Sequence, residues 1–282
     1  MDGPMRLPPW SSRSLLVVCL ASAVACTDGA KSAASASPDS GAPQAPSPSN
    51  DGGVASEACE AAGPVLTTLT TDDGILLTAD LYTTGKRGGP AAVLLHMIPP
   101  SNDRSNYPAA FITALVSRGV AVLNVDRRGA GGSGGVARDA YTGSKGALDA
   151  KAAVGLLRAH ACAFDETRVA VVGASNGTTT AVDYAVSAAT PPRALVLLTG
   201  GTYTESQTTI ADHRPLLGSI PTLFVFSTAE SSWSKGFSSG APATWRFEEY
   251  PNGAHGTGMF AAEPTSIDSV ASFVAASLAA TN

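Results

Sequence analysis

Short runs of apolar residues alternate with segments of helical periodicity from about residue 65 to the C-terminus. Apolar runs of five or six residues are typical of strands buried on both faces, whereas apolar positions spaced by three or four are typical of helices packed on a sheet. We expect strands at residues 65–70, 75–82, 91–96, 120–125, 169–173, 194–198, 222–226 and 245–250. We expect helices at residues 107–117, 145–160, 176–187 and 266–279.

This alternation predicts the α/β fold class, with a mostly parallel eight-stranded sheet and helices on both faces. The sheet is expected to begin with an antiparallel hairpin, because Asp73 and Gly74 separate the first two strands and Asp-Gly is a strong hairpin signal. Residues 200–220, between the sixth and seventh strands, are too few for a sizeable cap domain. We therefore expect an open site beyond the carboxyl ends of the strands, where ligands of such sheets bind.

The first 25 residues are predicted to be an export signal. Arg6 and Arg13 precede an apolar run at residues 15–25, which is shorter than the ~20 residues that cross a bilayer and is typical of a signal peptide. Cys26 follows Ala25 directly, an arrangement that resembles a bacterial lipobox. We expect cleavage before Cys26, its acylation with a palmitate-type chain, and a membrane-anchored lipoprotein on the periplasmic or cell-surface side of a bacterial envelope. Ordinary secretion after cleavage and an uncleaved anchor are the alternatives.

A low-complexity segment of Ser, Ala, Pro, Gly and Asp follows the candidate lipidation site. In residues 27–58 the only branched aliphatic residue is Val54, and no aromatic residue occurs. Such a segment cannot bury enough apolar surface to offset the entropy lost on ordering. We therefore expect a disordered linker up to residue 58 and a folded domain at residues 59–282.

Composition narrows the classes of function. The chain is 44% hydrophobic, which excludes complete disorder, and its net charge of −5 without a basic stripe argues against nucleic-acid partners. The His and Cys residues lack metal-ligand spacing, and no glycine-rich dinucleotide motif opens a helix after a strand, so we expect no metal and no cofactor. Cys59 and Cys162 are expected to pair in an oxidising compartment, with two separate thiols as the alternative.

The pattern G-x-S-x-G, typical of a nucleophile elbow, occurs around Ser133, Ser175 and Ser238. An elbow is a sharp turn between a buried strand and a helix, which exposes the serine at the end of the sheet. Only Ser175 has a predicted strand directly before it and a predicted helix directly after it. We therefore expect Ser175 to be the nucleophile, whereas Ser133 lies in a glycine-rich loop and no strand precedes Ser238.

A serine nucleophile needs a base that accepts its proton and a carboxylate that orients the base. His255 follows the last predicted strand and comes after the candidate acid in chain order, so we favour it as the base over His213. Glu230 is the only carboxylate in residues 227–245, directly after the seventh strand, and is expected to be the acid. The runner-up is Asp126, after the fourth strand, for which holding its loop is the stronger interpretation.

The negative charge that develops during acyl transfer needs two preorganised N–H donors. The backbone N–H of Asn176, at the start of a predicted helix, and that of Met97, just after a predicted strand, are the candidates. Three large side chains near these loops are candidates for substrate contact, with ordinary packing as an equal alternative. They are Tyr203, Trp233 and Met259.

Five segments, taken in order, resemble the α/β-hydrolase superfamily and, within it, dienelactone-hydrolase-like bacterial esterases. They are residues 93–97, 126–133, 172–177, 221–230 and 250–256, and the resemblance covers about residue 65 to the C-terminus. Two positions depart from the pattern of that family. Met97 stands where Gly is usual, and Glu230 stands where Asp is more frequent.

The resemblance and the candidate residues together imply a cofactor-free serine hydrolase of the carboxylesterase type. It would cleave small-molecule carboxylic esters through an acyl-enzyme, with Ser175, His255 and Glu230 as its triad. Amide or peptide cleavage is the first alternative, and a non-catalytic surface-binding lipoprotein on the same fold is the second.

Overall fold

A computed structural model describes residues 59–203 and 209–279 of the chain. The predicted signal peptide, the lipidation site Cys26 and the predicted linker at residues 27–58 lie outside the described residues. Among the residues that are described, no helix combines the length and the hydrophobicity that a transmembrane span requires.

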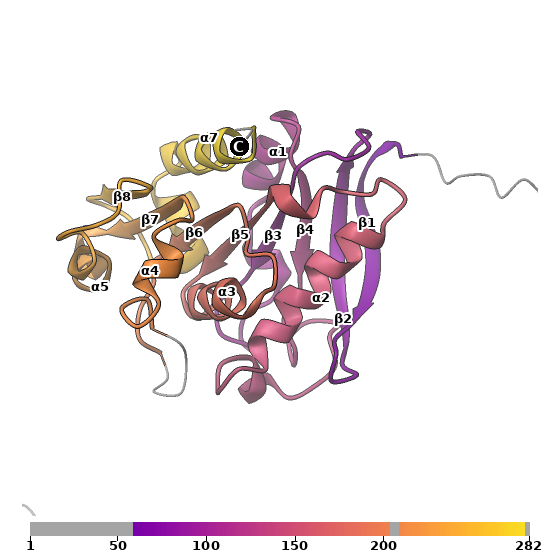
Figure 1. Cartoon of the computed structure of the whole chain (residues 1–282), viewed down its shortest axis with the longest axis horizontal. Helices are drawn as coiled ribbons and strands as arrows, with labels where there is room; N and C mark the ends of the chain where they lie inside the picture. The colour runs from indigo at the N-terminus through magenta and orange to yellow at the C-terminus, as the bar shows by residue number, and fades with distance from the viewer. Residues whose placement is uncertain (1–58, 204–208, 280–282) are drawn as a thin grey trace, which may run out of the picture. The chain divides into compact units, whose positions relative to one another are not determined.

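Eight strands form one sheet at the centre of the domain (Figure 1). They lie in the order β1-β2-β4-β3-β5-β6-β7-β8. β1 and β2 form an antiparallel hairpin, β2 also pairs antiparallel with β4, and the other neighbouring strands are parallel. The strands are β1 (Ala61–Thr70), β2 (Leu76–Thr84), β3 (Ala91–Leu95), β4 (Ala121–Val125), β5 (Val169–Ala174), β6 (Ala194–Leu198), β7 (Thr222–Ser227) and β8 (Trp245–Tyr250).

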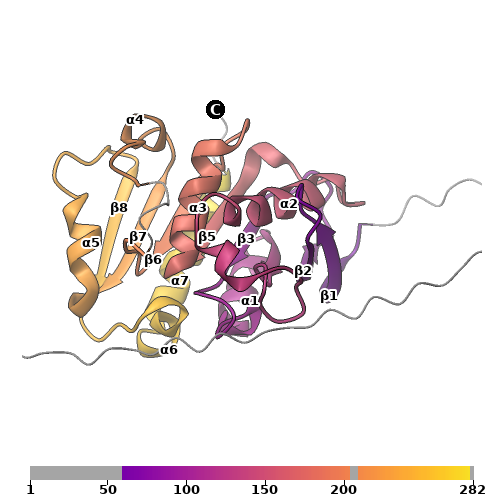
Figure 2. The ribbon, with the colours of Figure 1, turned by 90° about the horizontal axis from the view of Figure 1, so that it is seen from below.

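Helices cover both faces of this sheet (Figure 2): α2 and α3 pack on one face, and α1, α6 and α7 pack on the other. Successive side chains of a strand point to opposite faces, so each buried strand serves both layers. The α-helices are α1 (Ala109–Ser117), α2 (Gly146–Ala159), α3 (Asn176–Ser187), α4 (Arg214–Leu217), α5 (Ser231–Gly236), α6 (Met259–Ala262) and α7 (Thr265–Ala279). The 3-10 turns are η1 (Arg104–Asn106), η2 (Ala137–Ala140), η3 (Glu166–Arg168), η4 (Thr228–Glu230) and η5 (Gly256–Gly258).

Besides the pairing of β2 with β4, the turn of the β1–β2 hairpin is held by Arg128, which is buried in the loop after β4. Its guanidinium lies 2.8 Å from a carboxylate oxygen of Asp149 in α2 and 2.8 Å from one of Asp73 in the hairpin turn. The hydrogen bonds from Arg128 hold the pKa of Asp73 at about 2, below its usual value. The hairpin turn, the β4 loop and α2 are therefore joined by one cation.

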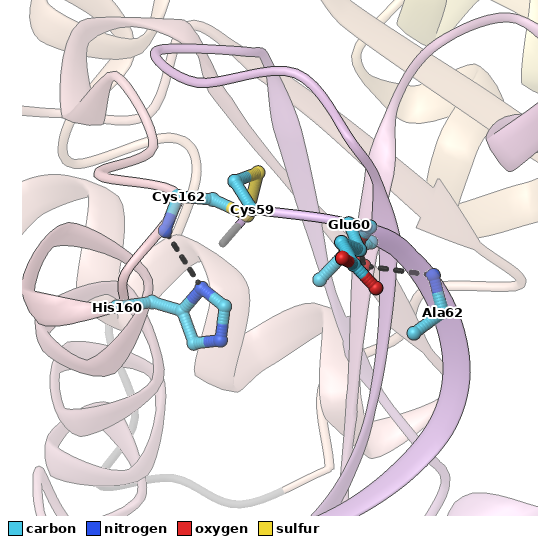
Figure 3. Close-up of a disulfide and its surroundings, with 6 residues drawn as sticks. Cys59, Glu60, Ala62, His160 and Cys162 are labelled. Atoms are coloured by element: carbon cyan, nitrogen blue, oxygen red, sulfur yellow. Dashed lines mark hydrogen bonds between the residues drawn. A yellow bond between two sulfur atoms is a disulfide. The ribbon is translucent and has the colours of Figure 1, made fainter. Parts of the chain in front are cut away.

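A disulfide joins Cys59, just before β1, to Cys162, in the loop after α2 (Figure 3). Cys162 is fully buried, and its N–H donates to Nδ1 of His160 at 3.1 Å. β1 lies at the edge of the sheet and most of its residues are exposed. The disulfide thus fixes the start of a strand that buries little surface, and it joins the two cysteines that were expected to pair.

The predicted strands and helices are all present, with ends shifted by a few residues at most. β1 begins earlier than expected, because a register shift between Ala62 and Val65 lets the strand continue past Gly63 and Pro64. The short helices α4, α5 and α6 were not predicted, since four to six residues are too few to display a helical periodicity.

Candidate active site

Ser175 lies at the sharp turn between β5 and α3. Its φ of 51° and ψ of −123° are unfavourable for a residue with a side chain and persist only where the surrounding structure enforces them. A Cβ on Gly173 would lie 2.3 Å from the carbonyl oxygen of Gly177, and a Cβ on Gly177 would lie 2.3 Å from that of Leu95. The N–H of Ser175 donates to the carbonyl of Leu198 at 2.9 Å. The glycines and the strands on both sides, β3 and β6, therefore hold the turn.

Ser175, His255 and Glu230 form a continuous chain of hydrogen bonds. Nε2 of His255 lies 2.7 Å from Oγ of Ser175, and Nδ1 lies 2.9 Å from Oε1 of Glu230. Glu230 ends the turn η4 after β7, and His255 directly precedes η5 after β8. An ionised carboxylate only accepts hydrogen bonds, so Nδ1 carries the ring proton and the lone pair of Nε2 faces the serine hydroxyl. This arrangement can remove a proton from Ser175.

The three side chains differ in their exposure to solvent. Ser175 is buried, whereas 47% of the His255 side chain and 40% of the Glu230 side chain are exposed. Oε2 of Glu230 is buried and has no hydrogen-bond partner within the described part of the chain. The His255 imidazole is therefore partly open to solvent. Of the two carboxylate oxygens of Glu230, Oε1 is the one that contacts the base.

The runner-up acid, Asp126, is fully buried and its carboxylate is engaged elsewhere. It forms an ion pair with Arg104 and accepts the backbone N–H groups of Arg104 and Gly132, each at 2.8 Å. Oγ of Ser133 donates to the carbonyl of Asp126 at 2.6 Å, so this serine belongs to the same loop. Oγ of Ser238 donates to a backbone carbonyl of α5 at 2.8 Å. The geometry brings none of these groups to His255.

The other histidines have different surroundings. Nε2 of His96 accepts the N–H of Arg127 at 2.9 Å, and burial lowers the pKa of His96 to about 3. His160 stacks on Phe164 with 5.6 Å between ring centroids. His213, the rival base, is the residue before α4. Of the four histidines, which all lie in the described part of the chain, only His255 is hydrogen-bonded to the serine at the elbow.

The N–H groups of Met97 and Asn176, the expected oxyanion donors, form no hydrogen bond with the residues that the structure describes. Asn176 begins α3, where the helix dipole favours a negative charge. The side chain of Met97 was given no role from the sequence, yet it packs at the site. A Cβ on Gly256 would lie 2.2 Å from Sδ of Met97 and 3.7 Å from Cβ of Ser175. The thioether therefore fills space beside the nucleophile.

The three expected lining residues differ in position. The hydroxyl of Tyr203 donates to the carbonyl of Thr199 at 2.7 Å, and burial raises the pKa of this hydroxyl. Trp233 is half-buried and packs edge-on against Phe237, with 5.0 Å between ring centroids. Met259 is fully buried in the core beside α7, so the expectation that it lines the site is wrong. Met259 begins the short helix α6, which was not predicted, so the direction of its side chain could not be inferred from the sequence.

Thr199, directly after β6, is a supporting residue that the sequence analysis missed. Its Oγ1 accepts the N–H of Gly256 at 2.6 Å, and its carbonyl accepts the hydroxyl of Tyr203. It therefore connects the loop that carries His255 to the loop after β6. The sequence offers one signal, the position of Thr199 at the end of an apolar run. This signal is not specific, because a polar residue commonly ends such a run.

One protein family and several solved structures are similar to the chain. Residues 73–211, just under half of the chain, match the family model of the X-Pro dipeptidyl-peptidases (S15 family). This match includes Ser175 but ends before Glu230 and His255. No curated protein sequence matches the chain.

Solved structures resemble the domain at low sequence identity. An esterase of Pyrococcus furiosus is 18% identical, with a TM-score of 0.62 over 77% of this chain and 92% of that chain. A putative alpha/beta hydrolase of Agrobacterium tumefaciens is 13% identical, with a TM-score of 0.59 over 74% and 94%. A puromycin-hydrolysing peptidase of Mycobacterium tuberculosis is 16% identical, with a TM-score of 0.62 over 80% of this chain but only 40% of that chain.

These similarities, together with the eight-stranded, mostly parallel sheet, define the fold. The chain has the α/β-hydrolase fold, as the resemblance of its sequence segments implied.

Proposed function

We propose that this protein is a serine hydrolase that cleaves carboxylic esters through an acyl-enzyme. Ser175 is the nucleophile, His255 the general base and acid, and Glu230 the carboxylate that orients the imidazole. The observation that carries this proposal is the chain of hydrogen bonds from Ser175 to His255 at 2.7 Å and on to Glu230 at 2.9 Å, at the end of a strained strand–turn–helix. Esterases among the similar structures support the same class of reaction.

In the acylation step, Oγ of Ser175 attacks the carbonyl carbon of the ester while Nε2 of His255 takes the hydroxyl proton. The carbonyl π electrons move to oxygen, and the N–H groups of Asn176 and Met97 stabilise the oxyanion. When the carbonyl re-forms, the bond to the alcohol oxygen breaks and His255 gives the proton to this oxygen. The alcohol leaves, and the acyl group remains bonded to Ser175.

In the deacylation step, a water molecule replaces the alcohol. Nε2 of His255 takes a proton from the water as its oxygen attacks the acyl carbon, and the same donors stabilise the second oxyanion. Collapse of this intermediate breaks the bond to Oγ of Ser175, which recovers its proton from His255. The free acid leaves. The exposure of His255 supports this step, because water can reach the base without displacing protein groups.

Steady-state hydrolysis of a series of p-nitrophenyl esters with acyl chains from C2 to C12 tests the proposal. The wild-type protein is expected to turn over the esters in this series, and the matched variant Ser175→Ala is expected to lose at least ~10³-fold in kcat while its unfolding temperature stays near that of the wild type. Equal rates for the wild type and Ser175→Ala would contradict the assignment of the nucleophile.

Amide or peptide cleavage is the second candidate. The match to X-Pro dipeptidyl-peptidases and the similarity to a puromycin-hydrolysing peptidase favour it, because the same groups can expel an amine after His255 protonates it. The p-nitroanilides of Ala-Pro and Gly-Pro, measured beside the esters, separate the two. A higher kcat/KM on the anilides than on all the esters would replace the ester proposal by this one.

We further propose that the subtype is that of dienelactone-hydrolase-like bacterial esterases, on the five segments that resemble this family, four of which contain Met97, Ser175, Glu230 and His255. We also propose an exported lipoprotein acylated at Cys26. The disulfide between Cys59 and Cys162 supports export, because such bonds persist in oxidising compartments.

A further inference from the structure

Arg127 is a fully buried cation behind the elbow, and its guanidinium binds only neutral oxygens in the described hydrogen bonds. Burial lowers its pKa to about 10, and the nearby carboxylate of Asp149 opposes this shift, so the group stays charged at neutral pH. The five acceptors are the carbonyls of His96 (3.2 Å), Met97 (3.2 Å) and Ala140 (2.6 Å), Oδ1 of Asn176 (2.9 Å) and Oγ1 of Thr180 (2.7 Å).

The first two contacts fix the turn that carries the Met97 N–H. The carbonyl of His96 and the N–H of Met97 belong to one planar trans peptide, so they point in opposite directions. When Nη1 of Arg127 binds this carbonyl, the N–H on the other side of the peptide is held in place. The turn after β3 therefore cannot rotate this peptide without breaking a hydrogen bond to a buried charge.

The ring of His96 strengthens the same turn. Its Nε2 accepts the backbone N–H of Arg127 at 2.9 Å, so the ring proton lies on Nδ1 and is donated to the carbonyl of Met97 at 2.8 Å. The low pKa of His96 keeps the ring neutral and preserves this tautomer. The carbonyl of Met97 thus has two donors, one from His96 and one from Arg127.

The remaining side-chain contacts reach α3. An arginine can only donate, so the amide of Asn176 must present its oxygen to Nη2, and Thr180 accepts from the same nitrogen one turn further along α3. One guanidinium therefore connects the turn after β3 to the first two turns of α3. These are the two elements whose N–H groups, those of Met97 and Asn176, face no partner among the described residues.

We propose that Arg127 is a positioning residue for the oxyanion hole. Its planar guanidinium sets the relative placement of the Met97 and Asn176 N–H groups, and its buried charge stabilises the oxyanion that forms between them. This inference rests on the proposed serine hydrolase function. Preorganised donors and a fixed charge in a site of low dielectric act on the transition state more than on the neutral ester. Arg127 should therefore influence kcat more than KM.

Arg128, the next residue, is a matched control. It is as buried as Arg127, but its guanidinium is paired with the carboxylates of Asp149 and Asp73 and donates no described hydrogen bond to the turn after β3 or to α3. Its charge is thus neutralised locally, and its contacts hold the hairpin and α2. Loss of Arg128 should lower stability without a specific effect on the oxyanion.

The test compares Arg127→Gln, Arg127→Lys and Arg128→Gln by kcat and KM on p-nitrophenyl acetate, by the inhibition constant of phenylboronic acid, and by the unfolding temperature. Boron binds Oγ of Ser175 as the serine proton passes to His255, which leaves a tetrahedral anion that resembles the oxyanion intermediate. For Arg127→Gln we expect a ~10–100-fold loss of kcat, a parallel loss of boronate affinity and a KM within about 3-fold of the wild type. Arg127→Lys keeps the charge but loses the planar guanidinium, so its kcat and boronate affinity should lie between those of the wild type and Arg127→Gln.

Arg128→Gln should lower the unfolding temperature and leave kcat and boronate affinity within about 3-fold. A folded Arg127→Gln with unchanged kcat and boronate affinity would overturn the inference. If Arg127→Gln does not fold, Arg127→Lys is the deciding variant. Unchanged kcat and boronate affinity in Arg127→Lys, which lacks the guanidinium, would contradict a positioning role. A wild type that neither hydrolyses the ester nor binds the boronate would overturn the proposed function, and the inference with it.

Discussion

Glu230 and Asp126 are both carboxylates that follow strands of the sheet, yet their different surroundings give them different roles. Glu230 touches His255, whereas Asp126 binds Arg104 and the N–H of Gly132. A buried carboxylate with several donors stabilises the loop that supplies them. A half-exposed carboxylate with a single imidazole partner fixes a tautomer instead.

Glu230→Gln should therefore reduce kcat steeply, by up to ~10⁴-fold, because the amide can also stabilise the wrong tautomer of His255. Glu230→Asp should keep part of the activity, since the charge remains while the reach shortens. Asp126→Asn should lower the unfolding temperature more than the turnover. The measurement is kcat/KM and the unfolding temperature on one short-chain ester. Near wild-type turnover in Glu230→Gln, with loss of turnover in a folded Asp126→Asn, would move the acid to Asp126.

At the scale of elements, short apolar runs were sufficient to predict the central strands β3 to β7, because a strand buried on both faces is composed almost entirely of apolar residues. The order of the elements placed Ser175, Glu230 and His255 after β5, β7 and β8, and parallel strands bring their carboxyl ends to one edge of the sheet. Arg127 and Thr199 could not be predicted. Their roles depend on the carbonyls and hydroxyls that surround them in space, and these are distant in the sequence.

The hairpin is joined to α2 through Arg128, and this connection should depend on pH. The pKa of Asp73 is lowered from 3.8 to about 2 by Arg128, so the pairing stabilises the fold fully above pH ~4 and is lost as the pH falls through about 2. Between pH 5 and 2, the unfolding temperature of Asp73→Asn should therefore fall less than that of the wild type. Asp72→Asn, which removes only an exposed pair with Lys151, is the matched control. Parallel declines for wild type and Asp73→Asn would contradict this role.

At the scale of the whole molecule, the Cys59–Cys162 bond closes a loop with a sequence separation of 103 residues and holds the exposed edge strand β1. The double variant Cys59→Ser/Cys162→Ser should lose ~2–5 kcal/mol, which lowers the unfolding temperature by about 5–15 °C. Dithiothreitol should lower the wild type to the same temperature and leave the variant unchanged. An unfolding temperature that neither change affects would show that the bond does not stabilise the domain.

The proposed anchor concerns the part of the chain before residue 59. Wild-type protein expressed in a bacterium should partition with membranes after cleavage before Cys26, whereas Cys26→Ser should be found in the soluble fraction or remain unprocessed. Fractionation and the mass of the mature N-terminal peptide measure this. Equal membrane association of the wild type and Cys26→Ser would refute the lipid anchor.

The central claim is that the strained turn after β5 carries a nucleophile activated by His255. The most direct measurement is covalent labelling with a fluorophosphonate, followed by mass mapping of the modified peptide. We predict one adduct, on Ser175, that is strongly slowed in His255→Ala, with Ser133 and Ser238 unmodified as internal controls because their hydroxyls donate to backbone carbonyls. No adduct on a folded wild type, or an adduct on another serine, would contradict the account.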